Sequence, residues 1–311
     1  MVDREDPRSP AGPTEPVPPG PGSPTAPATT ERFGYANLAS HLWSSSLSEA
    51  ERENLARLLE AQNLDPFLQI VARRSIELLR IGPGARVLDV GCGTGVLLPA
   101  LAELVGSSGK VVGLDYAPDL LAKAHERVRD AGCAAVVELV EGNAAHLPFE
   151  TGSFDAAHIE RVLMHLPDPG AAISEMRRIV RPGGWVVAAE PDNAGIRVDL
   201  PGDPEGMALL TAIQMTGMTN PAMGIELPRR FATAGLVETQ IVPMADFLDE
   251  YDADAAALDR EIGADAVARG LMTAERVESI ISYLTEASRR GEYAWFGMMV
   301  IAAGRVPIDG D

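Results

Sequence analysis

The sequence predicts an α/β protein whose core is a doubly wound, mostly parallel sheet. Apolar segments of strand character alternate with segments of helical periodicity between residues 86 and 189. The first of these strands ends in a glycine-rich turn that leads into a helix. The chain has 311 residues, and 46% of them are hydrophobic, which is enough for one large domain with a substantial core. Strands that alternate with helices form parallel sheets with right-handed crossovers.

The N-terminal residues 1–30 predict a disordered, proline-rich tail. Nine of these residues are proline, and glycine, serine and threonine make up much of the remainder. Such a segment cannot bury enough apolar surface to offset the entropy that is lost on ordering. We therefore expect a flexible leader, with a proline-rich ligand for a partner as the alternative.

Two helices are predicted in the next range, residues 31–82. Ser48 and Glu51 form a capping-box pattern at the start of the first helix. Asp65 and Pro66 mark the start of the second helix, because proline is favoured at the first helical position. The core of the domain then begins with the first strand.

The alternating region predicts five strands and three helices. The strands are expected at residues 86–90, 110–115, 136–140, 154–159 and 185–189. The helices are expected at residues 94–104, at 118–130, and from Asp168 to the turn Pro182-Gly183-Gly184. Each helix returns the chain to the same end of the sheet, so the strands share one carboxyl edge.

The regular alternation stops after the fifth strand. Residues 191–224 predict a cap insertion that is rich in proline and methionine. Its methionines line an adaptable apolar pocket or form the core of the cap; they are Met207, Met215, Met218 and Met223. The core then resumes with a helix near 227–234 and a strand near 237–242. A mostly helical, acidic insertion is expected at 246–290, and a last strand at 293–302.

Charge and cysteine content limit the classes of partner. The formal net charge is −19, from 26 Lys and Arg against 45 Asp and Glu, so no cationic surplus is available to neutralise nucleic acid or an anionic membrane. No apolar run approaches the roughly 20 residues of a membrane-spanning helix, and no signal core follows the N-terminus. Cys92 and Cys133 lie in no metal-binding or redox spacing. We therefore expect a cytoplasmic protein without a bound metal.

The strongest functional signal is the glycine-rich turn after the first strand. Asp89 ends that strand, and Gly91, Gly93 and Gly95 follow at every second position. Glycines allow the backbone to turn sharply and to approach a ligand closely. A dinucleotide-binding loop needs a third glycine where this chain has Val96, so NAD fits the pattern poorly. No Gly-Lys-Ser/Thr run is present that would bind phosphate in the manner of a P-loop.

Further motifs extend this signal and carry a family resemblance. They are Asp-Val-Gly-Cys-Gly-Thr-Gly at 89–95, Val-Gly-Leu-Asp at 112–115, Glu-Gly-Asn-Ala at 141–144, Leu-Pro-Phe at 147–149, Gly-Ser-Phe-Asp at 152–155, Arg-Val-Leu-Met-His-Leu-Pro-Asp at 161–168 and Arg-Pro-Gly-Gly at 181–184. In order and spacing the chain resembles the class I S-adenosylmethionine-dependent methyltransferases, of the type that acts on quinones, sterols and natural products. The resemblance implies a Rossmann-like, seven-stranded sheet with N-terminal helices and a helical cap insertion, in a methyltransferase domain at 31–311.

The resemblance also implies the residues that bind S-adenosylmethionine. Gly91 and Gly93 match the glycines that lie under its methionine and ribose parts, and Asp89 matches the acid that ends the first strand. Asp115 ends the second strand, where a carboxylate can accept hydrogen bonds from both ribose hydroxyls. Tyr116 follows at a position where the family has an apolar or aromatic residue beside the adenine.

The adenine is expected to contact the segment after the third strand. Asn143 stands where many relatives have an Asp, and its amide oxygen can still accept a hydrogen bond from the adenine amino group. Ala144 would donate its backbone N–H to the ring. Arg161 follows the fourth strand and faces the cofactor in this interpretation; the alternative is a surface or helix-capping arginine.

Glu190 and His165 are the candidate catalytic residues. Glu190 ends the fifth strand at the carboxyl edge of the sheet, and the alternative is a solvated or salt-bridged loop acid. Some similar methyltransferases have Leu-His-His where this chain has Leu163-Met164-His165, and the first histidine can serve as a base there. His165 is the histidine that this chain retains there. We expect it either to act as a base or to pack against a helix or the cofactor. His158 lies within a strand and is expected in the core.

The resemblance implies methyl transfer to a small molecule as the function. The apolar content of the cap favours a medium-sized, largely apolar acceptor, without nucleic acid or membrane insertion. Two alternatives stay open: a non-methylating enzyme of this fold, such as a cyclase, and a regulatory protein that binds S-adenosylmethionine. The sequence does not determine the acceptor, its reacting atom, the need for a base or the oligomeric state.

Overall fold

The fold was analysed in a computed structural model, which describes residues 60, 64–203, 206–207, 219–268 and 270–308. The capping box at Ser48 and Glu51 lies outside these residues, as do Met215 and Met218. The division into a tail at 1–30 and a domain at 31–311 therefore stays a prediction.

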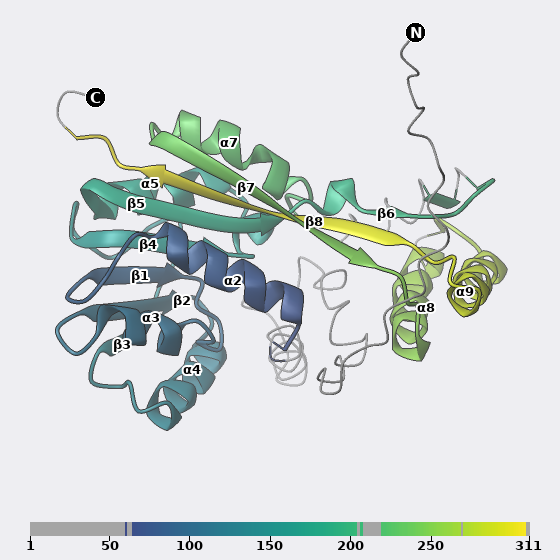
Figure 1. Cartoon of the computed structure of the whole chain (residues 1–311), viewed down its shortest axis with the longest axis horizontal. Helices are drawn as coiled ribbons and strands as arrows, with labels where there is room; N and C mark the ends of the chain where they lie inside the picture. The colour runs from purple at the N-terminus through teal and green to yellow at the C-terminus, as the bar shows by residue number, and fades with distance from the viewer. Residues whose placement is uncertain (1–59, 61–63, 204–205, 208–218, 269, 309–311) are drawn as a thin grey trace, which may run out of the picture.

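A single sheet of eight strands forms the centre of the molecule (Figure 1). The strands are β1 (Arg86–Val90), β2 (Lys110–Asp115), β3 (Val137–Glu141), β4 (Phe154–Glu160), β5 (Val180–Pro191), β6 (Arg197–Val198), β7 (Val237–Leu248) and β8 (Trp295–Arg305). Their order is β3-β2-β1-β4-β5-β8-β6. β7 pairs with β8 along the edge of β8 that faces away from β5. β1 to β5 are mutually parallel, whereas β8 is antiparallel to its neighbours. The predicted α/β class is confirmed, and the short β6 adds an eighth strand to the seven that were expected.

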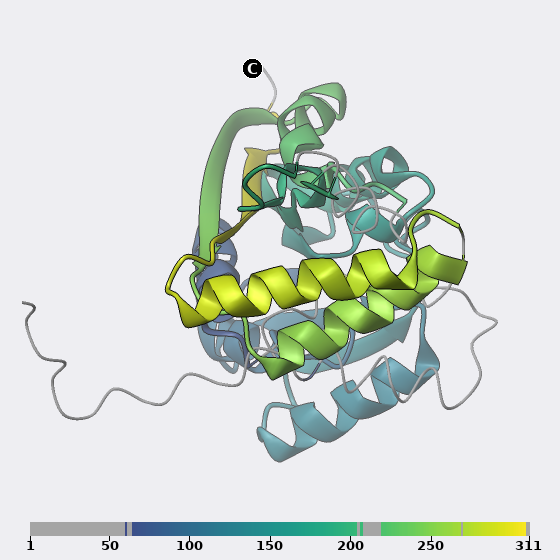
Figure 2. The same cartoon turned by 90° about the vertical axis from the view of Figure 1, so that its right-hand side faces the viewer.

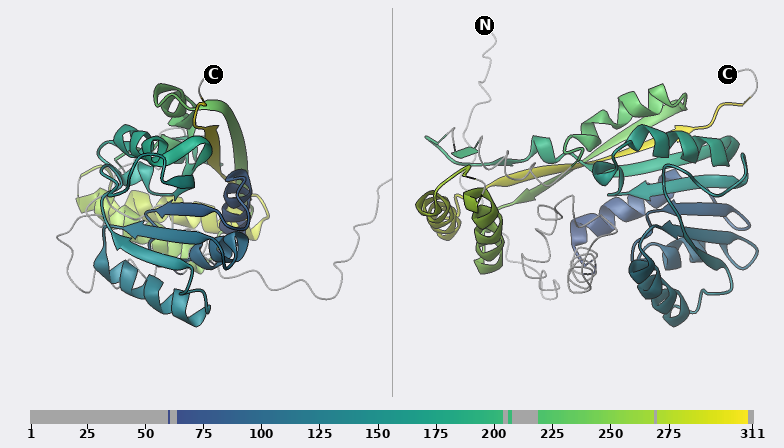
Figure 3. Two further views of the ribbon diagram at one scale, coloured as in Figure 1. Left: turned by 90° about the vertical axis from the view of Figure 1, so that its left-hand side faces the viewer. Right: turned by 180° about the vertical axis from the view of Figure 1, so that it is seen from behind.

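Helices cover both faces of this sheet, as Figure 3 shows. On one face lie α2 (Pro66–Leu78), α3 (Leu98–Val105) and α4 (Pro118–Asp130), which share a buried cluster with β1 and β2. On the other face lie α5 (Pro169–Ile179) and α7 (Met223–Thr233), which share a second cluster with β4 and β5. Two such cores are the consequence of a sheet that is apolar on both sides.

The helix after the glycine-rich turn begins later than predicted. It was expected from residue 94, but α3 begins at Leu98 and residues 94–97 form turns. Gly91, Gly93 and Gly95 all have positive φ values, of 70°, 54° and 78°. A left-handed residue cannot sit inside a right-handed helix, so the loop extends past Gly95. The longer loop leaves more backbone at the carboxyl edge of the sheet.

The helix α5 ends at Ile179, before the predicted Pro182-Gly183-Gly184 stop. These three residues lie within β5 instead. Gly183 has a φ of 80° and donates its N–H to the Val306 carbonyl at 2.9 Å, and the register of β4 with β5 shifts between Phe154 and Ala156. The turn residues therefore produce an irregularity inside a strand, because the neighbouring β8 edge supplies hydrogen-bond partners.

The C-terminal third forms a long ribbon that carries two helices (Figures 1 and 2). β7 runs to Leu248 and pairs with β8 over its length, so the helical insertion that was predicted from residue 246 begins later, with α8 (Ala253–Ala268) and α9 (Ala274–Arg289). These helices and the adjoining strand ends enclose a third buried cluster, which includes Ile281, Leu284 and Trp295.

Only part of the predicted cap at 191–224 lies within the described residues. It contains the 3₁₀ turn η4 (Asn193–Gly195) and β6. Met207 packs against the cluster under α8 and α9, and Met223 is fully buried at the start of α7. Neither of these two methionines lines the cavity described below. For them, the structure favours ordinary core packing over a pocket lining.

Candidate functional site

A cavity of about 600 Å³ opens at the carboxyl ends of β1, β2 and β4. Its walls come from α2, from the turn after β1, from the ends of β2 and β4, and from the segments at 142–144 and 161–167. All eight residues predicted to bind the cofactor line this cavity: Asp89, Gly91, Gly93, Asp115, Tyr116, Asn143, Ala144 and Arg161. His165 lines it as well, and Glu190 does not.

The turn after β1 forms the floor of the cavity. The N–H groups of Gly91 and Cys92 both donate to the Leu114 carbonyl, at 2.6 and 3.0 Å, which ties the turn to β2. A Cβ atom at Gly91 would collide with the side chain of Val162. Glycine is therefore required at position 91 by its positive φ and by the close approach of the 162 segment.

Asp115 connects the end of β2 to this turn. Its carboxylate accepts hydrogen bonds from the backbone N–H groups of Gly93 and Ala117, both at 2.9 Å. The side chain is buried, and burial raises the pKa of Asp115 above its ordinary value despite these donors. Each carboxylate oxygen has two lone pairs, so the group can also accept two hydroxyls from the cavity. Tyr116 follows with 37% exposure, and burial of its phenol raises the pKa of Tyr116 to about 12.

Asp89 is held by a buried histidine. The Nδ1 atom of His158 lies 2.9 Å from the Asp89 carboxylate, and its Nε2 atom lies 2.9 Å from the Ser75 hydroxyl on α2. The Ser75 hydroxyl donates to the Ala72 carbonyl, so it accepts from Nε2. Burial by itself would lower the pKa of His158, but the hydrogen bond to Asp89 raises it above the ordinary value. His158 is therefore in the core, as predicted, and it also orients Asp89.

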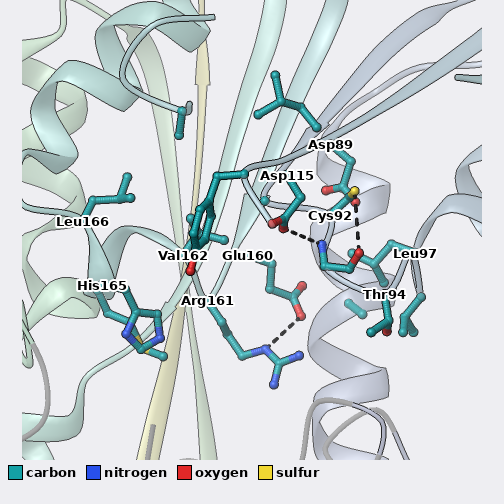
Figure 4. A pocket seen from close by; sticks show the side chains of 18 of the residues that line it. Asp89, Cys92, Thr94, Leu97, Asp115, Glu160, Arg161, Val162, His165 and Leu166 are labelled. Carbon is teal, nitrogen blue, oxygen red and sulfur yellow. Dashed lines mark hydrogen bonds and ion pairs between the residues drawn. The ribbon is translucent and has the colours of Figure 1, made fainter. Parts of the chain in front are cut away.

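Glu160 is a cavity residue that the sequence reasoning missed. It ends β4 and lies two residues after His158, on the same face of the strand. One carboxylate oxygen lies 3.4 Å from the Ser75 hydroxyl and 3.9 Å from the His158 ring, and the other lies 3.7 Å from the Arg161 guanidinium (Figure 4). Burial raises the pKa of Glu160. The rule that selected Glu190, an acid at the carboxyl end of a parallel strand, applies equally to this residue.

Arg161 has an uncommon backbone conformation at the same edge. Its φ is 56°, in the left-handed region that favours glycine, and its N–H donates to the Ala189 carbonyl at 2.9 Å. Strained backbone of this kind gathers at functional sites, where the surrounding structure holds it. The conformation places the Arg161 side chain along the cavity wall beside Glu160 (Figure 4).

Asn143 and Ala144 lie at the same end of the cavity as Asp115 and Tyr116. The Asn143 side-chain oxygen accepts a hydrogen bond from the Ala145 N–H at 2.9 Å, which fixes the amide as an Asx-type turn. That oxygen keeps a second lone pair that a ligand can use. Ala144 is buried and packs into the core under this segment.

Glu190, which was predicted as a catalytic residue, is not among the residues that line the cavity. Its fully buried carboxylate accepts the backbone N–H groups of Val162, Leu163 and Met164, at 2.9, 2.8 and 3.2 Å. Burial raises the pKa of Glu190 to about 7, although the three donors favour the ionised form. The carboxylate thus caps the short 3₁₀ helix η3 (Leu163–His165) and positions the cavity wall.

His165 lies at the end of η3 and lines the cavity. Burial, with the positive charge of Arg161 nearby, lowers the pKa of His165 to about 3. Its imidazole is therefore neutral near pH 7 and a weak proton acceptor, although it can still form hydrogen bonds.

Outside the cavity, Asp252 has a structural role at the start of α8. Asp252 accepts the N–H groups of Asp254 and Ala255 and so caps the start of α8. Among the described residues, no group of three or more His, Cys, Asp or Glu side chains is arranged to hold a metal ion. No described helix combines the length and apolar character needed to cross a bilayer.

Comparison with known proteins places this site within a family. Residues 88–188 match a methyltransferase domain family. The chain is 36% identical over 186 residues to a demethylmenaquinone methyltransferase of Bacillus cytotoxicus, covering 55% of this chain and 78% of that protein. It is 34% identical over 224 residues to an uncharacterised 37.1 kDa protein in a transposon of Streptomyces fradiae, covering 67% of this chain and 64% of that protein.

The matched lengths vary among the relatives. The alignment spans 64% of the Streptomyces protein and 54% of the demethylmenaquinone methyltransferase of Bacillus subtilis, so the chain covers little more than half of some relatives. Among solved structures, the YcgJ protein of Bacillus subtilis shares the fold, with a TM-score of 0.54 and 19% identity over 76% of this chain and 98% of that one. By its sequence match and its fold, the chain belongs to the class I S-adenosylmethionine-dependent methyltransferases.

Proposed function

We propose that this protein transfers a methyl group from S-adenosylmethionine to a medium-sized, largely apolar small molecule. The observation that carries the proposal is the cavity that joins the Gly91 turn and the Asp115 carboxylate to an apolar wall. Leu68 and Ile76 on α2 contribute to that wall, and Leu166 contributes from the opposite side. Relatives named demethylmenaquinone methyltransferase support an apolar acceptor.

The residues at one end of the cavity fit the adenosyl part of this cofactor. Asp115 would accept the two ribose hydroxyls, and the turn with Gly91 and Gly93 lines the cavity beside it. Asn143 and Ala144 would offer an acceptor and an N–H to the adenine edge, beside the ring of Tyr116. When bound, the cofactor supplies a methyl group on a positively charged sulfur atom, which makes the methyl group reactive.

The chain itself mainly orients the acceptor and excludes water. An acceptor held about 3–3.5 Å from the methyl carbon gains most of its rate from alignment. The apolar wall from α2 favours a dry site, in which electrostatic effects are stronger. His165 is too weakly basic to take a proton efficiently near pH 7, so we propose that it positions the acceptor or the cofactor and leaves the proton to solvent.

Partner classes and location are part of the same proposal. The acceptor is a small molecule, since the net charge of −19 disfavours nucleic acid. Cys92 and Cys133 are free thiols, which fits the reducing cytoplasm.

Calorimetric titration and product analysis test this function. The protein is titrated with S-adenosylmethionine, S-adenosylhomocysteine and NAD, and we expect it to bind the first two and not the third. It is then incubated with methyl-deuterated S-adenosylmethionine and a panel of reduced quinones and other apolar acceptors. Equal amounts of labelled product and S-adenosylhomocysteine support methyl transfer. Conversion of an acceptor without S-adenosylhomocysteine favours a cyclase-like enzyme, and binding without any turnover favours a regulatory protein.

A further inference from the structure

The order of the strands sets the order of chemical groups along the cavity. Asp115 ends β2, the Gly91 turn follows β1, and Glu160 ends β4, and these are three neighbouring strands. Adjacent strands lie about 4.7–4.9 Å apart, so Asp115 and Glu160 stand about 10 Å apart across the sheet edge. An elongated ligand whose sugar binds Asp115 and which lies over the Gly91 turn therefore extends toward Glu160.

The Glu160 carboxylate is buried, and its neighbours of opposite charge are Arg161 and His158. Its side chain is 8% exposed, and its nearest polar atoms lie 3.4 Å (Ser75), 3.7 Å (Arg161) and 3.9 Å (His158) away. These distances exceed those of strong charge-assisted hydrogen bonds, which are about 2.7–2.9 Å. A buried carboxylate in such surroundings gains stability from any cation that enters the cavity.

Charged groups from each neighbouring element face this carboxylate. On β1 the Asp89 carboxylate interacts with it, and on β4 the His158 ring is engaged by Asp89. Arg161 follows in the chain, Arg73 on α2 lines the same cavity, and Glu190 on β5 adds a negative charge when it is ionised. Asp89 is paired with His158 at 2.9 Å, whereas the cationic groups of Arg161 and His158 lie 3.7 and 3.9 Å from Glu160, so Glu160 is the less tightly paired carboxylate at this end.

We propose that Glu160 recognises the positive charge of the sulfonium and so allows the protein to distinguish S-adenosylmethionine from S-adenosylhomocysteine. This inference rests on the proposed function. The two molecules share the adenosine, the amino group and the carboxylate, and they differ in that the product has a neutral thioether. The preference favours binding of the substrate form and release of the product form.

Proton release accompanies this preference. Burial raises the pKa of Glu160 above its ordinary value. A cation next to the group stabilises the carboxylate, and the proton passes to the buffer. Affinity for S-adenosylmethionine therefore rises with pH where this carboxyl titrates, whereas affinity for S-adenosylhomocysteine changes less.

Isothermal titration calorimetry of the full chain with both ligands tests the inference without an acceptor. Wild type, Glu160→Gln and Glu160→Asp are compared between pH 5.5 and 8, in two buffers with different ionisation enthalpies. Glu150→Gln is the matched control, since Glu150 is an exposed carboxylate that does not line the cavity. The measured quantity is the dissociation constant of S-adenosylhomocysteine divided by that of S-adenosylmethionine. We expect Glu160→Gln to lower this ratio by about fivefold to tenfold, because it weakens binding of S-adenosylmethionine and leaves the affinity for S-adenosylhomocysteine nearly unchanged.

The variants and the wild type provide separate decisions. Glu160→Asp should keep part of the preference, and Glu150→Gln should keep all of it. A ratio that is the same in Glu160→Gln and wild type overturns the inference. If Glu160→Gln does not fold, Glu160→Asp decides: a ratio equal to that of the wild type overturns the inference. A wild type that binds neither ligand instead overturns the proposed function, and the inference with it.

Discussion

At the scale of single residues, Asp115 serves both the fold and the ligand. Its carboxylate accepts the N–H of Gly93 and so fixes the turn after β1, while its remaining lone pairs face the cavity. The same side chain thus shapes the floor and supplies the acceptors. An acid at this position could be recognised from the sequence because it is the last residue of an apolar segment.

Replacement of Asp115 should weaken cofactor binding strongly. Hydrogen bonds to a charged group contribute about 1.5–3 kcal/mol each, so we expect Asp115→Ala to reduce the affinity for S-adenosylmethionine by at least about tenfold. Affinity for S-adenosylhomocysteine should fall by the same factor, because the ribose is common to both. Titration calorimetry measures both constants, with Asp130→Ala at the exposed end of α4 as the control. Unchanged affinity in Asp115→Ala would refute this assignment.

Two glutamates show what reasoning from single residues cannot decide. Glu160 and Glu190 both lie at or near the carboxyl ends of parallel strands, and the sequence reasoning selected the wrong one for the cavity. A strand pattern shows that neighbouring side chains alternate between faces, but it does not show which face meets the ligand. Only the packing of α2 beside β4, and of η3 against β5, decides this.

At the scale of elements, η3 depends on a single carboxylate. Glu190 satisfies three N–H groups at the start of this short helix, which carries Met164 and His165 into the cavity wall. Helix starts leave N–H groups without partners inside the helix, so a buried acceptor here is structurally required. The sequence does not reveal this cap, because 26 residues or more separate the acceptor from the donors.

Glu190 should also make the stability of the protein depend on pH. The pKa of Glu190 is about 7 in the folded protein and 4.5 ordinarily, so between these values the folded state holds a proton that the unfolded chain releases. The contribution of this group to the free energy of unfolding therefore falls as pH rises from 4.5 to 7, and it is constant above 7.

The variant Glu190→Gln isolates this contribution. Urea unfolding of wild type and Glu190→Gln is measured at pH 5, 6, 7 and 8, and the difference in unfolding free energy is compared. We expect the advantage of the wild type to shrink from pH 5 to pH 7 and then to level off. A difference that does not vary with pH would show that Glu190 has no raised pKa in the folded state.

At the scale of the whole molecule, the chain builds a helical unit at a distance from the parallel sheet. The β7–β8 ribbon leads from the sheet to α8 and α9 (Figure 1), and these helices enclose their own buried cluster. Tyr251 and Asp259 share a hydrogen bond of 2.7 Å within this unit. A cluster that is separate from the two sheet cores can open without exposing them.

Leu284→Ala should test this independence. Leu284 is almost fully buried in the α8–α9 cluster, and truncation of a buried leucine costs about 2–5 kcal/mol. We expect faster amide hydrogen exchange in α8 and α9, unchanged exchange in β1 to β5, and unchanged affinity for S-adenosylhomocysteine. Ser282→Ala, on the exposed face of α9, is the matched control. Equal loss of protection in β1 to β5 would mean that the molecule opens as one unit.

The sequence by itself determined the α/β class, the glycine-rich turn and the acid that closes β2. These features depend on contiguous residues, because hydrophobic periodicity and the need for positive φ are local properties. The tertiary structure alone decided that Ser75 and His158 contact the cavity residues Asp89 and Glu160, with hydrogen bonds across separations of 69 to 85 residues. It also decided that Glu190 turns away from that cavity. Such contacts follow from strand order and from which helix covers which face, and neither is encoded in any single segment.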